Sequence, residues 1–345
     1  MTWFIVAIFL AIWVVGHYRA VPHSLRWAIM AVIICAIIAL HYIFPDTHAV
    51  RVATRGTARD WIVLLVLGLV VAGYRVGLRK IRARVANAQP TPGPVGTFGQ
   101  GELTRYARHI VLREIGGPGQ KRLKQAKVLV IGAGGLGAPV LMYLAAAGVG
   151  RLGVVDDDVV DESNLQRQII HTTATQGRAK VTSAAQSIQA LNPYVDVRAY
   201  NTRITADNAA DMLAEYDVVV DGSDNFATRY QVNAAAARAG KPLVSGALSQ
   251  WEGQVSVFDP AQGTPCYQCI FPQPPDPDLA PNCAAAGVFA PLPGIIGSIM
   301  GAEVAKIITG AGTPLRGRLM LYDALDATSR TVRISPRGDC PVCGG

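Results

Sequence analysis

The chain has 345 residues, of which 50% are hydrophobic and only 16% are charged. With a mean hydropathy of +0.28, the chain is too apolar to be a disordered protein and too apolar for an ordinary soluble enzyme. The net charge of +8 lies wholly within residues 1–96, because these carry ten basic and two acidic residues and the rest of the chain sums to zero. Such a distribution is typical of charges that flank membrane segments, so we expect no nucleic acid as a partner.

Three apolar segments predict a membrane module of about three helices over residues 1–86. They are residues 1–18, 27–45 and 61–78, and each is close to the ~20 residues that cross a bilayer as a helix. A signal peptide is the alternative for the first segment, although no basic stretch precedes it. The third segment is followed by the densest basic cluster of the module, which consists of Arg75, Arg79, Lys80, Arg82 and Arg84. The positive-inside bias then predicts a multi-pass protein of the cell (inner) membrane with its C-terminal part in the cytoplasm.

Residues 87–101 are rich in proline and glycine and predict a linker, so that a soluble domain occupies residues 102–345. Its first expected element is an amphipathic helix over 102–116. Short apolar strands then alternate with helices, which predicts an α/β fold with a Rossmann-like, doubly wound and mostly parallel sheet. The expected strands are 127–132, 151–156, 217–225 and 241–246, and the expected helices are 138–148, 177–191 and 230–240.

From Gly253 onward the alternation stops. Three short strand-like stretches, at 253–258, 318–323 and 331–334, predict an added antiparallel region. The segment 291–309 is apolar over 19 residues, so a fourth membrane span is one reading of it. The charged Glu303 and Lys306 inside it, together with its prolines and glycines, favour a buried helix of the soluble fold instead.

A glycine-rich motif, G-x-G-x-x-G, lies between the first expected strand and the next helix and consists of Gly132, Gly134 and Gly137. Glycines at these places let a phosphate approach backbone N–H groups at the start of a helix. Asp156 ends the following strand, where a carboxylate can hold ribose hydroxyls. Alone, this motif predicts an adenine nucleotide with NAD as the default, so an NAD-dependent oxidoreductase is an alternative function.

The residues after this strand carry the charges that a reaction at the phosphates of ATP requires. Arg167 and Lys180 can offset the negative charge that builds on phosphoryl oxygens in the transition state. Asp224, at the carboxyl end of the third expected strand, can hold Mg²⁺ on the phosphates. Neutral donors beside these groups are Asn164 and Gln168. Since a dehydrogenase needs no such cations, the set favours ATP chemistry.

Four of the six cysteines form two C-x-x-C pairs, namely Cys266, Cys269, Cys340 and Cys343. Four thiolates suit tetrahedral Zn²⁺ and leave no open position, so the expected role of the metal is structural. Two redox pairs or an iron–sulfur cluster are the alternatives. Six cysteines are too few for the disulfide framework of a secreted protein of this length.

Several motifs occur together and in a specific order: R-Y-x-R-H-I (105–110), G-A-G-G-L-G, D-x-D (156–158), S-N-L-Q-R-Q (163–168), D-G-S-D-N (221–225), A-P-L-P-G (290–294) and the two C-x-x-C pairs. In this set, residues 102–345 resemble the ThiF/MoeB-type adenylyltransferases, which activate ubiquitin-like sulfur carriers for molybdopterin or thiamine biosynthesis. These enzymes are relatives of the ubiquitin-activating enzymes. The resemblance does not extend to residues 1–96, and a membrane module departs from the usual soluble member of the family.

The resemblance implies a homodimeric enzyme that joins the C-terminal glycine of a carrier ending in Gly-Gly to AMP and releases pyrophosphate. It places Gly134 and Gly135 under the phosphates of ATP, and Asp224 on Mg²⁺ and the nucleotide. Asn225, beside Asp224, is assigned to the nucleotide site, and Arg108 would reach the γ-phosphate in the neighbouring subunit. We expect any sulfur donor to be a separate protein.

Cys283 lies in a segment where some members of this family carry a cysteine that forms a thioester or acyl-disulfide with the carrier. The resemblance therefore implies a covalent role, and a bystander cysteine is the alternative. A tRNA-modifying dehydratase relative is a further alternative function, although the paired C-x-x-C motifs favour the sulfur-carrier branch. His109 and His171 stand alone in the sequence and are interpreted as packing or surface residues.

Overall fold

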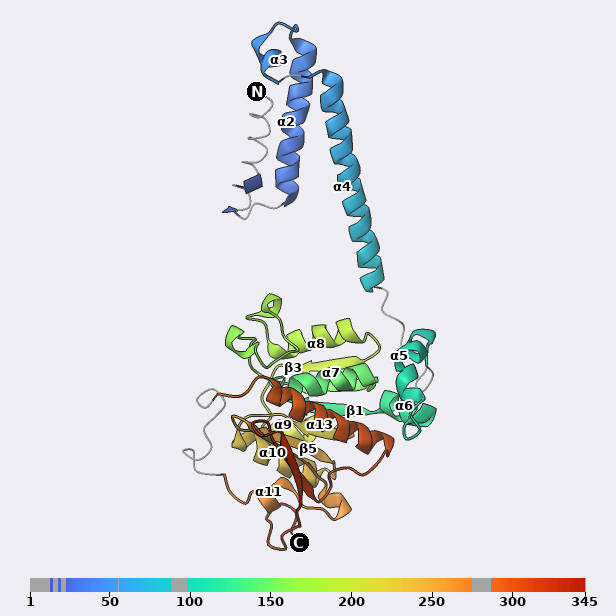
Figure 1. The fold of residues 1–345 in the computed structure, drawn as a ribbon, viewed down its shortest axis with the longest axis vertical. Coiled ribbons are helices and arrows are strands. Elements are labelled where there is room, and N and C mark those ends of the chain that lie inside the picture. The colour runs from blue at the N-terminus through green and yellow to red at the C-terminus, as the bar shows by residue number, and fades with distance from the viewer. Residues whose placement is uncertain are drawn as a thin grey trace. The chain divides into compact units, whose positions relative to one another are not determined.

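The computed structural model describes residues 13–14, 18–19, 23–54, 56–87, 98–274 and 287–344. The chain divides into two compact units, Met1–Gln89 and Pro90–Gly345, which Figure 1 shows in blue and in green to red. Of the first expected membrane segment, residues 1–18, nearly all lies outside the described residues.

Within its described residues, the N-terminal unit contains helices α2 (His23–Ile43), α3 (Ala49–Thr54) and α4 (Ala58–Asn87). Helices α2 and α4 pack against each other around the buried side chains of Ile37 and Trp61. Their stretches Leu25–Ile43 and Ala58–Leu78 are long and apolar enough to cross a membrane. Most of the apolar side chains on α4 are exposed, so this unit has little core of its own.

The C-terminal unit is built on one eight-stranded sheet with the order β3-β2-β1-β4-β5-β6-β7-β8. The first five strands are parallel, whereas β6, β7 and β8 continue the sheet in antiparallel pairing. The expected fold class, a doubly wound parallel sheet with an antiparallel extension, is thereby confirmed. The strands are β1 (Lys127–Ile131), β2 (Arg151–Val155), β3 (Asp196–Tyr200), β4 (Val218–Asp221), β5 (Leu243–Leu248), β6 (Glu252–Phe258), β7 (Arg318–Asp323) and β8 (Thr328–Arg333).

Helices cover both faces of the sheet, because its apolar residues alternate between two cores. Along β1, Val128 and Val130 join the core under α7, α8 and α13, whereas Leu129 and Ile131 join the core under α9 and α10. These helices are α7 (Gly137–Ala147), α8 (Lys180–Leu191), α9 (Ala206–Ala214), α10 (Phe226–Arg238) and α13 (Pro291–Thr309). Helix α13 is the apolar segment 291–309, and it packs on α7 and the sheet with Leu292, Ile296 and Met300 buried.

Two expectations about the elements were wrong. The helix expected over 102–116 is α5 (Gln100–Ile110), and a second helix, α6 (Gly116–Gln125), follows a turn. Helix α5 ends at Ile110, and turns follow in which the N–H of Leu112 donates to the His109 carbonyl at 3.1 Å and that of Gly116 donates to the Leu112 carbonyl at 2.8 Å. In addition, β3 and α9 lie between elements that were expected to be adjacent. Strand β3 is an edge strand with no fully buried residue, so its sequence lacks an apolar run.

Candidate active site

The glycine motif lies at the point where the sheet changes its winding direction. Strand β1 has β2 on one side and β4 on the other, and the chain leaves β1 through Gly132 and β4 through Gly222. The N–H of Gly222 donates to the Ile131 carbonyl at 2.9 Å, and that of Gly132 donates to the Val155 carbonyl at 2.8 Å. Doubly wound sheets bind ligands at such a crevice, outside the carboxyl ends of the strands.

Two of the glycines are required by the geometry of the turn. Gly132 has a φ of +89°, and a Cβ atom on Gly137 would lie 1.8 Å from the Gly132 carbonyl oxygen. No side chain fits at the second position, and few are compatible with the first. Helix α7 therefore begins directly at the turn and presents its unpaired N–H groups there, which favours an anion.

The next two glycines leave a bare surface that faces the S-N-L-Q-R-Q segment. A Cβ atom on Gly134 would lie 3.7 Å from Nε2 of Gln168. On Gly135 it would lie 3.7 Å from Cγ of Arg167 and 3.2 Å from Cβ of Pro293, which belongs to the A-P-L-P-G segment. An arginine and an amide thus flank a helix start that lacks side chains, and this donor set suits the phosphates of ATP.

Arg167 and Gln168 differ in how they are held. Nη2 of Arg167 donates to Oδ1 of Asn164 at 2.7 Å, so Asn164 orients the guanidinium. Gln168 is only 5% exposed, and its Oε1 has no hydrogen-bond partner among the residues that the structure describes. A buried amide without its partner is costly, and a ligand or an ordered water molecule at the glycine turn would relieve this cost.

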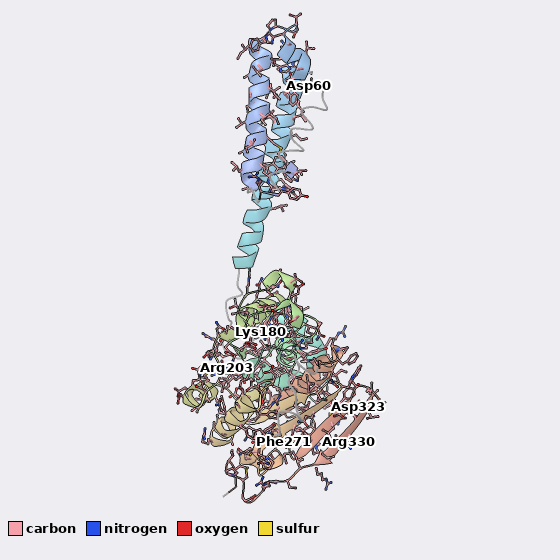
Figure 2. The ribbon with its side chains drawn as sticks, turned by 90° about the vertical axis from the view of Figure 1, so that its left-hand side faces the viewer. Asp60, Lys180, Arg203, Phe271, Asp323 and Arg330 are labelled. Carbon is pink, nitrogen blue, oxygen red and sulfur yellow. The ribbon has the colours of Figure 1, made fainter. Side chains whose placement is uncertain are left out.

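Lys180 begins α8 and is 5% exposed (Figure 2). Its Nζ lies 2.9 Å from Oδ2 of Asp158, whose side chain is mostly exposed. Asp156 of the same D-x-D motif accepts hydrogen bonds from the N–H groups of Ala133 at 2.7 Å and Asp158 at 2.9 Å. The carboxylate of Asp156 therefore ties the glycine turn to the segment that pairs with Lys180, besides lying where a ribose is expected.

Asp224 and Asn225 follow β4 at the same edge of the sheet. Asp224 is exposed, and its carboxylate has no hydrogen bond or ion pair in the described part of the chain, so it is accessible to Mg²⁺. Oδ1 of Asn225 accepts from the N–H of Thr228 at 2.9 Å and caps α10. The side-chain oxygen of Asn225 thus holds the helix start beside Asp224.

Two expected site residues are not brought to the glycine turn. Arg108 is exposed on α5, and this helix packs through Tyr106 against Gly148, at the opposite end of α7 from the turn. A role for Arg108 at a nucleotide therefore requires a second copy of the chain. Cys283 lies outside the described residues, and its covalent role stays a prediction.

His171 was interpreted as a packing or surface residue, but the structure places it against the glycine turn. Nε2 of the buried ring donates to the Ala133 carbonyl at 2.9 Å, and Nδ1 lies 2.9 Å from Oγ of Ser183 on α8. Burial lowers the pKa of His171, with a smaller contribution from the charge of Lys180. A neutral ring thus links the turn to α8. No local pattern signals this, because all its partners are distant in sequence.

The four cysteines of the C-x-x-C pairs form a cluster near the C-terminus, and their sulfur atoms lie within 4.8 Å of one another. The Sγ of Cys266 is 3.9 Å from that of Cys269 and 3.6 Å from that of Cys340, and the Sγ of Cys269 is 3.3 Å from that of Cys343. Tetrahedral zinc with Zn–S bonds of ~2.3 Å needs sulfurs about 3.8 Å apart. Donor set and spacing fit a structural Zn²⁺. Asn233 of α10 supports the cluster by donating to the Cys266 sulfur at 3.6 Å.

Comparison with known proteins bears on the C-terminal unit. The sequence profile of the ThiF family matches residues 106–342. A sulfur carrier protein adenylyltransferase of Thermus thermophilus is 55% identical over 249 residues, which cover 70% of this chain and 91% of that protein. The SAMP-activating enzyme E1 of Haloferax volcanii is 49% identical over 243 residues, which cover 70% of this chain and 89% of that enzyme.

Other relatives are longer or more distant. A probable adenylyltransferase/sulfurtransferase of Mycobacterium tuberculosis, MoeZ, is 52% identical, but the match spans only 63% of its length. Among solved structures, E. coli MccB with AMPCPP and MccA superimposes with a TM-score of 0.62 at 22% identity, covering 74% of this chain and 77% of that one. This last similarity concerns the fold alone.

Proposed function

The chain belongs to the ThiF family and is an adenylyltransferase, and from this premise we propose that it adenylates the C-terminal glycine carboxylate of a ubiquitin-like sulfur carrier ending in Gly-Gly. The observation that carries the proposal is the position of Arg167 and Gln168 beside the bare glycines at the start of α7. Relatives named for the activation of sulfur-carrier and SAMP proteins support it. The pathway would be molybdopterin or thiamine biosynthesis.

In the proposed reaction, a carboxylate oxygen of the carrier attacks the α-phosphorus of ATP. The bond from this phosphorus to the oxygen that bridges to the β-phosphate breaks, and pyrophosphate leaves with the electron pair. Two anions must meet, so the site has to lower their repulsion. The start of α7 and Arg167 would hold the phosphates, Asp156 would hold the ribose, and Gln168 would donate from its amide.

Lys180 has a distinct part in this proposal. Its Nζ pairs with Asp158 in the structure, and Asp158 is exposed, so water screens that ion pair. A triphosphate carries more charge than one carboxylate and would share or displace Asp158. Asp224 would hold Mg²⁺, whose contribution when bound is to neutralise charge on the phosphates.

Three finer features belong to the proposal as well. The catalytic unit would form a homodimer in which Arg108 of one copy serves the nucleotide of the other. The apolar stretches Leu25–Ile43 and Ala58–Leu78 would anchor the protein in the cell membrane, with the catalytic unit in the cytoplasm. The cysteine cluster would hold a structural Zn²⁺.

The experiment is ATP–pyrophosphate exchange by the full-length chain, with and without a small ubiquitin-like carrier ending in Gly-Gly. We expect exchange that depends on both the carrier and Mg²⁺. A carrier that lacks the two terminal glycines is the control and should give none. Exchange that is equal with both carriers would remove the glycine carboxylate as the acceptor.

A further inference from the structure

We infer that Arg229 is a positioning residue of the nucleotide site, which fixes the loop carrying Asp224 to the middle of β5. The inference rests on the proposed function, since Asp224 is there proposed as a ligand of Mg²⁺. Arg229 lies in the first turn of α10, and only 6% of its surface is exposed. It therefore points into the fold and not toward a substrate.

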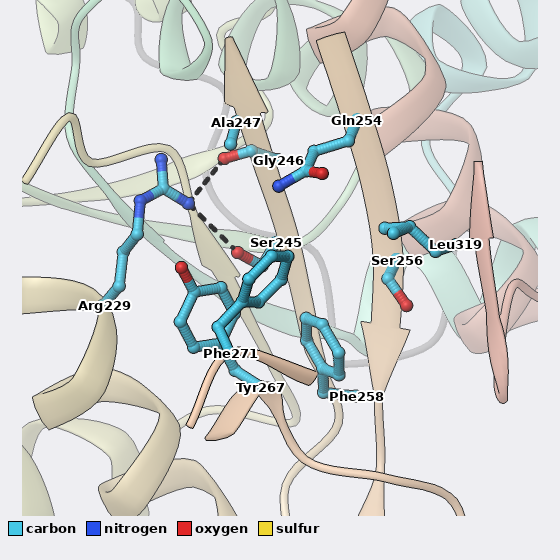
Figure 3. A pocket seen from close by; sticks show the side chains of 10 residues that line it. All are labelled: Arg229, Ser245, Gly246, Ala247, Gln254, Ser256, Phe258, Tyr267, Phe271 and Leu319. Atoms are coloured by element: carbon cyan, nitrogen blue, oxygen red, sulfur yellow. Dashed lines mark hydrogen bonds between the residues drawn. The ribbon is translucent and has the colours of Figure 1, made fainter. Parts of the chain in front are cut away.

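The guanidinium group of Arg229 connects the loop after β4 to the middle of β5. Nη2 donates to the carbonyl of Ser223, the residue directly before Asp224. Nη1 donates to the carbonyl of Gly246 at 2.7 Å and to Oγ of Ser245 at 3.3 Å, both on β5 (Figure 3). One planar group thus holds the loop after β4 and the neighbouring parallel strand at a fixed separation.

Asp221 holds the same loop from the other direction. This carboxylate is fully buried at 0% exposure and lies 3.5 Å from Nη1 of Arg229. Its Oδ1 accepts from the N–H of Ser223 at 3.0 Å and from Oγ of Ser223 at 2.6 Å, and its Oδ2 accepts from Oγ of Ser245 at 3.2 Å. Because a buried carboxylate requires a paired charge, the guanidinium group of Arg229 completes the set of partners of Asp221.

The hydrogen bonds of Asp221 and Arg229 hold the loop on one side of Asp224 and leave the side chain of Asp224 itself unbound in the described part of the chain. On one side Ser223 is bound by Asp221 and Arg229, and on the other side Asn225 is bound to the N–H of Thr228 at 2.9 Å. The carboxylate of Asp224 itself has no partner in the described part of the chain. A carboxylate that binds a metal works best when its backbone is immobile, and here the immobility comes from its neighbours.

Holding the loop and β5 together requires the two separate donor groups of a guanidinium. A lysine at position 229 would keep a positive charge near Asp221, but one ammonium group cannot reproduce two parallel donors that reach separate carbonyls. Arg229→Lys should therefore preserve the fold better than a neutral variant while it loosens the loop. Arg238→Lys, at the exposed end of the same helix, is the matched control.

The test measures the affinity of the full-length chain for ATP by calorimetric titration, with and without Mg²⁺ and without any carrier. For Arg229→Lys we expect affinity for Mg²⁺–ATP to fall about 10-fold, and affinity for metal-free ATP to change by no more than about 2-fold. Arg238→Lys should match the wild type in both. A merely structural role would lower the melting temperature and the fraction of active protein while leaving the affinity of that fraction unchanged.

The outcomes separate this inference from the proposed function. If the wild type does not bind Mg²⁺–ATP, the proposed function itself is wrong. If it binds and Arg229→Lys binds equally well, or loses affinity equally with and without the metal, the positioning role is overturned while the function stands. Should Arg229→Lys fail to fold, Ser245→Ala removes one acceptor of the fork and should show the same metal-dependent loss at about 3-fold.

Discussion

The glycine-turn site and the cysteine cluster are built in opposite ways, although α10 touches both. At the glycine turn the charged side chains have internal partners, as Lys180 has in Asp158 and Arg167 has in Asn164. In the cysteine cluster three of the four residues are buried, and the four sulfur atoms lie within 4.8 Å of one another, so a cation between them is needed to offset thiolate charge. The two cations of the first arrangement keep a partner when no ligand is bound, whereas the second arrangement is incomplete without its metal.

This difference indicates how each region depends on its ligand. A site that binds a nucleotide and releases product must be stable in both states, and internal ion pairs with exposed partners provide this. A site for a permanent metal has no such need, so its ligand becomes part of the folding free energy. Loss of a ligand of the cluster should therefore cost more stability than loss of a ligand-binding side chain at the glycine turn.

Removing one ligand of the cluster should be the most damaging change. We expect Cys269→Ser to lose bound zinc and to cost more than ~4 kcal/mol of folding free energy, or roughly 10 °C in melting temperature. Metal analysis and thermal unfolding of the purified chain check this. Cys35→Ser, at an exposed cysteine on α2, is the control and should change neither quantity. Full zinc content in Cys269→Ser would contradict the assignment.

A methyl group in the glycine turn should come next. In Gly137→Ala the new Cβ would lie 1.8 Å from the Gly132 carbonyl oxygen, so the turn must open, at a cost of about 3 kcal/mol. We also expect ATP–Mg²⁺ to lose its protective effect on thermal unfolding. Gly117→Ala is the matched control, since nothing lies within 4 Å of its added Cβ. Equal stability of the two variants would show that the turn is not tightly packed.

Asp224→Ala should remove activity without loss of stability. The exposed carboxylate has no contact partner in the part of the chain that the structure describes, so the melting temperature should stay within about 1 °C. Pyrophosphate exchange should fall about 100-fold, because the proposed Mg²⁺ ligand is gone. Asp211→Ala, on the exposed side of α9, provides the control for charge. An active Asp224→Ala enzyme would take Asp224 out of the mechanism.

The smallest expected effect concerns pH. Because burial lowers the pKa of His171 below its ordinary value of ~6.5, the unfolded chain binds a proton more readily than the folded one. The stability that depends on the neutral ring is complete above about pH 6.5 and is lost as the pH falls below it. The free energy of unfolding of the wild type should exceed that of His171→Asn by less at pH 5.5 than at pH 7.5. We expect this difference between the two proteins to shrink by about 1 kcal/mol in denaturant titrations. The half-buried His109 provides the control variant, and an unchanged difference for His171→Asn would contradict the prediction.

Local patterns predicted the parts of this molecule whose cause is local. The glycine motif, the apolar strands and the C-x-x-C pairs each follow from spacing within a few residues. Strand β3 was not predicted because an edge strand needs no apolar run, and none of its residues is fully buried. The expected helix over 102–116 was too long because its amphipathic pattern continues through residues that form turns after Ile110.

The residues that sequence reasoning missed act over long separations. His171 meets Ala133, and Arg229 meets Gly246, only because the tertiary fold brings together segments that are distant in the sequence. Asp158 was noticed as part of a motif, yet its pairing with Lys180 depends on how α8 begins. One clue was local: Arg229 follows the helix cap Asn225 by four residues, which places it on the first turn of α10, beside the loop.

The central claim is that the C-terminal carboxylate of a carrier becomes joined to AMP in this site. The most direct measurement is the intact mass of a ubiquitin-like carrier ending in Gly-Gly after incubation with the full-length chain, ATP and Mg²⁺. We predict a gain of one AMP that is lost on treatment with pyrophosphate and absent when the terminal glycines are deleted. A carrier of unchanged mass, in the presence of a chain that binds NAD in preference to Mg²⁺–ATP, would contradict the account.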